Sequence, residues 1–82
     1  MTDLFEHQLI AMLERGLVVF VEILPASEGW YVRINGYHWL RSRRQCPHLF
    51  TRGPEKLMYY LRDLGCMRVT VDLTVWPETK SL

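Results

Sequence analysis

At residues 30–40 the chain reads WYVRINGYHWL. The Asn-Gly pair at 35–36 separates two runs rich in aromatic and β-branched residues, which is the strongest short signal for a β-hairpin. With a two-residue type I′ turn, Ile34 would pair with Tyr37, and Val32 with Trp39. One hairpin face would then carry Trp30, Val32, Ile34, Tyr37 and Trp39, and the other Tyr31, Arg33, His38 and Leu40. We expect the first face to lie in the core.

The segments before this hairpin predict a helix and then a strand. Residues 3–15 place Phe5, Leu9, Met12 and Leu13 on one helical face. Asp3 is the predicted N-cap and Gly16 the residue that ends the helix. Residues 17–24 are β-branched and aromatic, which predicts a central strand. Residues 25–29 predict a turn.

The segments after the hairpin predict a second helix and a last strand. Pro54 suits the first helical position, and Gly65 suits the end of the helix. The buried stripe would be Leu57, Tyr60, Leu61 and Leu64. Residues 67–76 alternate apolar and polar, as in a half-buried strand. Residues 77–82 are expected to be a flexible tail.

The predicted fold is therefore one α+β domain over residues 1–82, with the order α-β-β-β-α-β. We expect a four-stranded mixed sheet with two helices on one face. The last strand would run parallel to the third strand or lie beside the first. Hydrophobic residues make up 49% of the 82 residues, which is an adequate supply for a core of this size.

The N-terminus is acidic, and the longest apolar stretch, residues 17–21, is far too short to span a membrane. We therefore expect a cytoplasmic protein with no membrane association. In that compartment Cys46 and Cys66 would be free thiols, Cys46 facing solvent and Cys66 in the core.

Charge is concentrated in one part of the chain. Residues 29–62 carry seven Lys or Arg and one acid, whereas residues 1–28 carry five acids and one Arg. The centre of the basic region is the predicted loop and helix start, with Arg41, Arg43, Arg44, Arg52 and Lys56. These side chains suit contact with phosphates or with an acidic protein surface. The competing interpretation is an edge protected against aggregation, and the net charge of +1 is low for a nucleic-acid binder.

Catalytic and metal signals are weak. Cys46 and His48 form only half of a zinc-ligand pattern, and residues two apart on a loop rarely face one another. We expect no catalytic residue, no metal and no cofactor. A surface formed by Tyr31, Arg33, His38 and Leu40 on the sheet face opposite the helices is instead a candidate docking or dimer surface.

Three motifs suggest a family. They are WYVRI at residues 30–34, LMYYLRDLG at 57–65 with Phe50 before it, and RVTVD at 68–72. Together they resemble small accessory proteins of plasmids and mobile elements, in the partition-associated ParC-type group that is unrelated to the topoisomerase subunit of that name. The resemblance covers about half the chain. It implies a bacterial origin and a role in maintaining mobile DNA, and it transfers no catalytic residue.

The sequence thus favours a small non-enzymatic binding protein that acts through a nucleic-acid or protein interface. We expect a protein partner, with nucleic acid and a second copy of the chain as further candidates. The first alternative is an inhibitor or immunity-type adaptor that docks on a nucleic-acid-processing enzyme by presenting its charged loop. The second is a thiol-dependent enzyme built on Cys46 and His48. The choice between DNA, RNA and protein stays open.

Overall fold

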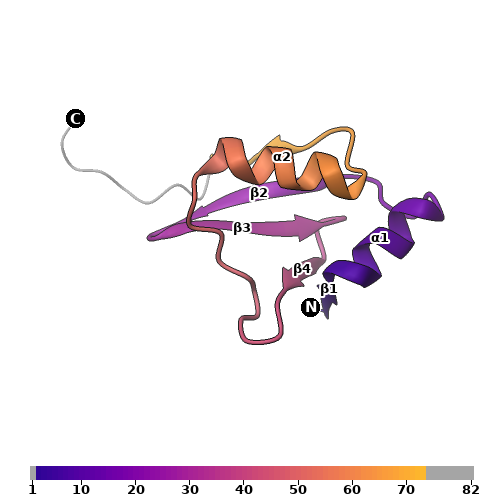
Figure 1. Ribbon diagram of the computed structural model, residues 1–82, viewed down its shortest axis with the longest axis horizontal. Coiled ribbons are helices and arrows are strands. Elements are labelled where there is room, and N and C mark those ends of the chain that lie inside the picture. Colours follow the sequence, from indigo (N-terminus) through magenta and orange to yellow (C-terminus); the bar gives the residue numbers. More distant parts are fainter. Residues whose placement is uncertain (1, 74–82) are drawn as a thin grey trace.

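A computed structural model describes residues 2–73 of the chain, and Figure 1 shows its arrangement. The elements are β1 (Thr2–Phe5), α1 (Glu6–Glu14), β2 (Val21–Ala26), β3 (Gly29–Ile34), β4 (His38–Arg41), α2 (Pro54–Leu64) and β5 (Thr70–Val71). The predicted α+β class is confirmed. The sheet has five strands instead of the four predicted, because the first residues of the chain form a strand.

The sheet order is β1-β4-β3-β2-β5. Strands β2, β3 and β4 are antiparallel neighbours, whereas β1 runs parallel to β4 and β5 runs parallel to β2. The last strand therefore lies beside the strand at 21–26, which was one of its two predicted places. It spans Thr70–Val71 only. The predicted strand at 67–76 is therefore wrong at 67–69 and 72–73, which are not strand, and Met67 and Leu73 are exposed. Residues 74–76 of that prediction, and the predicted tail at 77–82, lie outside the described residues.

The predicted helix at 3–15 is wrong in its first turn. Residues 2–5 form β1, in which Leu4 pairs with Leu40 and is only 8% exposed. Helix α1 begins at Glu6, and the N–H of Phe5 donates to Oε1 of Gln8 at 2.8 Å. Asp3 is therefore not the cap. Helical spacing within 3–15 could not reveal this strand, because its partner lies more than thirty residues away.

The hairpin turn is confirmed, but the predicted register is wrong. Asn35 and Gly36 have φ of +58° and +69°, and the N–H of Tyr37 donates to the carbonyl of Ile34 at 3.1 Å. Beyond this turn, however, Ile34 pairs with His38 and Arg33 with Trp39. Tyr37 is therefore an extra residue, and the shift by one exchanges the two faces of β4.

Both helices cover the face that the shifted register creates. Leu9 of α1 and Leu57 and Leu61 of α2 are buried in one core with side chains of the sheet. The sheet side chains in this core are Leu4, Val21, Ile23, Val32, Ile34 and Leu40. Cys66, two residues after the end of α2, is buried there as predicted.

The opposite face carries Tyr31, Arg33 and Trp39. Arg33 forms an ion pair with Glu22 at 2.9 Å, and its guanidinium lies 5.5 Å from the centre of the Trp39 ring. Tyr31 contacts Trp39 edge to face, with 6.0 Å between ring centres.

Strand β2 begins at Val21, four residues later than predicted. Before it, the backbone of residues 17–20 is held by the side chain of Asn35. The N–H of Val19 donates to Asn35 Oδ1 at 2.6 Å, and Asn35 Nδ2 donates to the carbonyl of Leu17 at 3.1 Å. This leaves Val19 82% exposed and Leu17 52% exposed at the end of the molecule that also carries Met67, which is 93% exposed.

Candidate functional site

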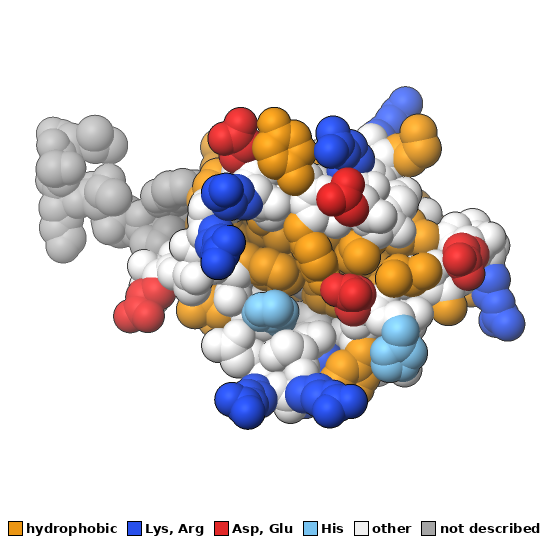
Figure 2. All heavy atoms as spheres, in the orientation of Figure 1, with side chains coloured by type: hydrophobic (Ala, Val, Ile, Leu, Met, Phe, Trp, Pro, Cys, Tyr) orange, Lys and Arg blue, Asp and Glu red, His pale blue; other side chains and the backbone are white. Residues whose placement is uncertain are grey.

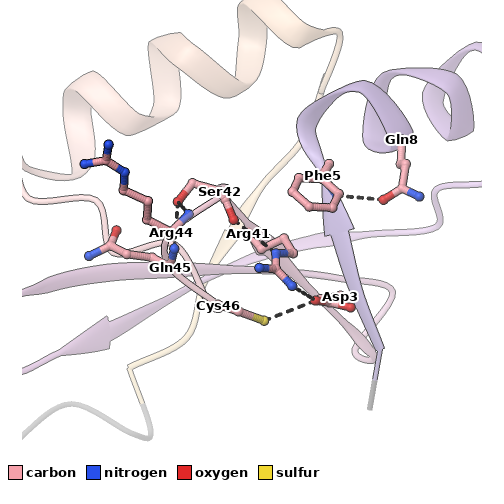
Figure 3. Close-up of polar contacts among 8 residues, drawn as sticks. All are labelled: Asp3, Phe5, Gln8, Arg41, Ser42, Arg44, Gln45 and Cys46. Carbon is pink, nitrogen blue, oxygen red and sulfur yellow. Dashed lines mark hydrogen bonds and ion pairs between the residues drawn. The ribbon is translucent and has the colours of Figure 1, made fainter.

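The candidate site is built around the loop at residues 42–53, which leaves the sheet after β4 and returns to it before α2. Within the loop, Ser42 Oγ accepts the N–H of Gln45 at 3.0 Å, and Gln45 Oε1 accepts the N–H of Leu49 at 3.2 Å. Figure 3 shows the Ser42 and Gln45 side chains beside the loop backbone. Its own side chains therefore fix the loop's shape.

The loop returns to the sheet at Phe50. The N–H of His48 donates to the carbonyl of Leu40, and Phe50 and Trp30 exchange two backbone hydrogen bonds, all three at 2.9 Å. This pairing requires a glycine at position 29. A Cβ on Gly29 would lie 2.4 Å from the carbonyl oxygen of Phe50. The glycine thus permits the close approach that anchors residues 48–50.

Arg41, one of the five predicted basic residues, is paired with an acid of β1. Its Nη1 lies 2.6 Å from Asp3 Oδ2, and its guanidinium lies 4.8 Å from the centre of the Phe5 ring. Figure 3 shows the Arg41 side chain directed toward Asp3. The hydrogen bond from Arg41 lowers the pKa of the Asp3 carboxyl. This ion pair depends on tertiary structure, because the pairing of β1 with β4 brings Asp3 beside Arg41.

Cys46 belongs to the same contact. Its Sγ lies 3.3 Å from Asp3 Oδ2, and this hydrogen bond to a carboxylate raises the pKa of the thiol. A raised pKa disfavours the thiolate that nucleophilic chemistry requires. His48, the other member of the predicted Cys–His pair, has its pKa lowered mainly by burial. The geometry therefore favours a protonated Cys46 and a neutral His48.

Four of the five predicted basic residues are exposed. Arg43, Arg44, Arg52 and Lys56 are exposed, and none of their side chains forms an ion pair within residues 2–73. Figure 2 shows Lys and Arg side chains beside the N-terminal end of α2 and on the loop below it, with hydrophobic side chains in the recess between. We call these four residues the basic end.

A pocket of about 370 Å³ lies between the loop and α2. It is lined by His48, Phe50, Tyr60 and Leu57, with Arg52 and Lys56 also on its wall. The centre of the Phe50 ring lies 4.1 Å from the centre of the His48 ring, in a stacked orientation, and 5.4 Å from the centre of the Tyr60 ring. Sequence reasoning placed Tyr60 in the core and missed the pocket. The alternation of His48 and Phe50 was the one local sign that both rings lie on the same side.

A second recess of about 300 Å³ continues past His48 and Tyr60 toward Phe5, Glu6 and His7. The hydroxyl of Tyr60 donates to Oε1 of Glu6 across it. Burial, followed by this hydrogen bond, raises the pKa of Tyr60. Together the two recesses form a groove along His48 and Tyr60. Its α2 end carries Arg52 and Lys56, which form no ion pair within residues 2–73, and its other end carries Glu6 and Arg41, the latter paired with Asp3.

The start of α2 is less suited to an anion than most helix starts. Pro54, its first residue, has no N–H, and Glu55 adds a carboxylate to the first turn. We therefore assign the positive character of this end to its side chains.

The predicted docking surface is not a single face. Tyr31 and Arg33 lie on the open side of the sheet, whereas Leu40 is 1% exposed in the core beneath the helices. His38 shares the core side with Leu40, and its Nδ1 is hydrogen-bonded to Thr2 Oγ1. The extra residue at Tyr37 causes this division, because it turns residues 38 and 40 inward.

Residues 2–73 contain no group of three or more His, Cys, Asp and Glu side chains that could hold a metal ion. No helix in the same range is both long enough and apolar enough to cross a membrane. Comparison of the chain with family models, with curated proteins and with solved structures found no match.

Proposed function

We propose that this chain is a small non-enzymatic binding protein that contacts nucleic acid through its basic end. The observation that carries the proposal is that Arg43, Arg44, Arg52 and Lys56 are all exposed, and that two of them, Arg52 and Lys56, line a pocket that also contains aromatic rings. Cations beside aromatic rings suit a ligand that presents phosphates together with flat bases.

The distribution of ion pairs supports this choice of residues. Arg33 and Arg41 have acidic partners in Glu22 and Asp3, so their charges are balanced within the fold. The basic end has four cations against one acid in its stretch of the chain, residues 42–56. The low total charge of +1 therefore does not describe this end of the molecule.

The test is binding of fluorescently labelled DNA and RNA oligonucleotides as a function of salt, measured by anisotropy. Each phosphate contact contributes a slope of about 0.7 on single strands and 0.9 on duplex in a plot of log K against log salt. Replacing Arg43 and Arg44 by Ala should therefore flatten the slope by about 1.4–1.8.

The matched control replaces Arg15 and Arg68, which are exposed cations outside the basic end. This double variant should keep the wild-type slope. If the wild-type protein binds no DNA or RNA at low salt, where the attraction is strongest, the proposal is wrong. An equal loss of slope in both double variants would also contradict it. The proposed link to mobile DNA rests on the family resemblance of residues 30–72 alone.

A second candidate function is an inhibitor or immunity-type adaptor that docks on a nucleic-acid-processing enzyme. The apolar end of the molecule favours it, because Val19 and Met67 are 82% and 93% exposed beside a recess of about 380 Å³. Exposed apolar groups of this kind are common in protein interfaces. Under this function, Val19→Asp should abolish capture of a nuclease or polymerase from host lysate, whereas the Arg43 and Arg44 double variant should retain it.

A further inference from the structure

The pocket beside the basic end has the dimensions and lining of a ligand site. Its volume of about 370 Å³ falls within the range of about 300–1,000 Å³ that is usual for small-molecule sites. Rings and an aliphatic side chain form its apolar part, and Arg52 and Lys56 are its charged part. A ligand with one flat apolar portion and one anionic portion would match both.

The backbone that carries two of the rings is fixed without a ligand. Phe50 exchanges two backbone hydrogen bonds with Trp30, and the N–H of His48 donates to the carbonyl of Leu40. The ring of Phe50 packs against those of His48 and Tyr60, and the Tyr60 hydroxyl donates to Glu6. Binding would therefore require little rearrangement of the backbone, which favours affinity.

His48 is the outermost ring of this stack. It is half-buried, lies against Phe50 with 21° between the ring planes, and borders both recesses of the groove. The other side of this group is Tyr60, whose ring contacts that of Phe50. A further flat ring could extend this stack by lying against His48, as bases do on aromatic side chains.

Charge gives the groove a direction. Arg52 and Lys56 lie at the pocket end and form no ion pair within residues 2–73, whereas the adjoining recess holds the carboxylate of Glu6 together with Arg41, whose charge is paired with Asp3. A phosphate is therefore attracted more strongly to the first end than to the second. A nucleotide would thus place its phosphate beside Arg52 and Lys56 and its base toward His48.

We propose that this pocket takes one unstacked base of a single-stranded nucleic acid, with the adjacent phosphate on Arg52 and Lys56. This inference rests on the proposed function and makes it more specific. A base in a duplex is paired and stacked within the helix, so it could enter the pocket only after leaving the stack. Single strands should therefore bind more tightly than a duplex of the same sequence.

The experiment measures anisotropy with a labelled single-stranded oligothymidylate and with the corresponding thymidine–adenine duplex. His48→Ala should weaken binding of the single strand about tenfold and leave duplex binding unchanged. The matched control is Tyr59→Ala, which removes a 52% exposed ring from the same region of α2 without touching the pocket. It should leave both affinities unchanged.

Photocrosslinking of the wild-type protein provides a measurement that does not depend on a variant folding. An oligothymidylate with one 4-thiothymidine should crosslink to residues 48–60, as mapped by mass spectrometry. Equal affinity for single strand and duplex, or crosslinks confined to the loop tip at Arg43 and Arg44, would overturn the base pocket and leave the proposed function standing. Absence of binding to both probes would overturn both.

Discussion

Replacing Leu40 by Ala tests the register on which the site depends. In the structure Leu40 is 1% exposed, and it lies between Leu4 on β1 and the core residues of β3. Loss of a buried Leu side chain costs about 2–5 kcal/mol, and paired strands on both sides limit how far this site can collapse. We therefore expect a loss of about 3 kcal/mol in the free energy of unfolding.

For a domain of this size, each kcal/mol lowers the melting temperature by about 4–8 °C, so Leu40→Ala should lower it by about 12–24 °C. Circular dichroism during heating, together with urea titration, measures both quantities. Leu40→Met, which nearly conserves volume, should cost less than about 1.5 kcal/mol. Tyr37→Ala, at a position that is 52% exposed, should cost less than either.

The reasoning would be refuted if Leu40→Ala cost no more than Tyr37→Ala. That result is expected from a two-residue turn without the extra residue, since it would place Leu40 on the surface and Trp39 in the core. In that alternative register the carbonyl of Leu40 would no longer accept the N–H of His48, as it does in the structure. His48 would then lose the bond that places it beside the pocket.

Three further outcomes are expected. Gly29→Ala should lower the melting temperature and reduce single-strand affinity, because its Cβ would collide with the carbonyl of Phe50 2.4 Å away; unchanged binding would show that this anchor is dispensable. Asp3→Asn should speed alkylation of Cys46 at neutral pH, because the carboxylate that raises the thiol pKa is removed, and a slower reaction would contradict the assignment. Burial lowers the pKa of His48 below 6.5, so its contribution to stability is complete above that pH and declines as the pH falls further. Between about pH 8 and pH 5 the melting temperature should fall less steeply with pH for His48→Gln than for the wild-type protein. Equal pH dependence in the two proteins would show that His48 is not the source of the acid destabilisation.

Much of the secondary structure could be predicted because its signals are local. The Asn-Gly turn requires positive φ at both residues, and the structure has it at Asn35 and Gly36. Helix α2 has Pro54 at its first turn and ends at Gly65, whose φ is +117°. These signals depend only on neighbours within a few residues, so they can be read without knowing the rest of the fold.

The exposed cations of the site were also predictable. Arg43, Arg44, Arg52 and Lys56 cluster in the sequence between two recognisable elements. Charged side chains on a loop are rarely buried, so their exposure follows from composition alone.

The tertiary structure decided which residues these cations act with. It brought Asp3 beside Arg41 and Cys46, and it packed Phe50 against Tyr60 of α2. Each of these contacts joins different elements or a loop to an element. Their formation depends on strand pairing and packing between distant segments, which no local periodicity encodes.

The faces of the sheet show the same division most sharply. The sequence alone determined that residues 30–40 form a hairpin with its turn at 35–36, but one unpaired residue after the turn decided which side chains reached the core. Because side chains alternate with a period of two along a strand, that single residue turned Leu40 inward and Trp39 outward. Local sequence specified the turn, and only packing against β1 and the helices selected the register.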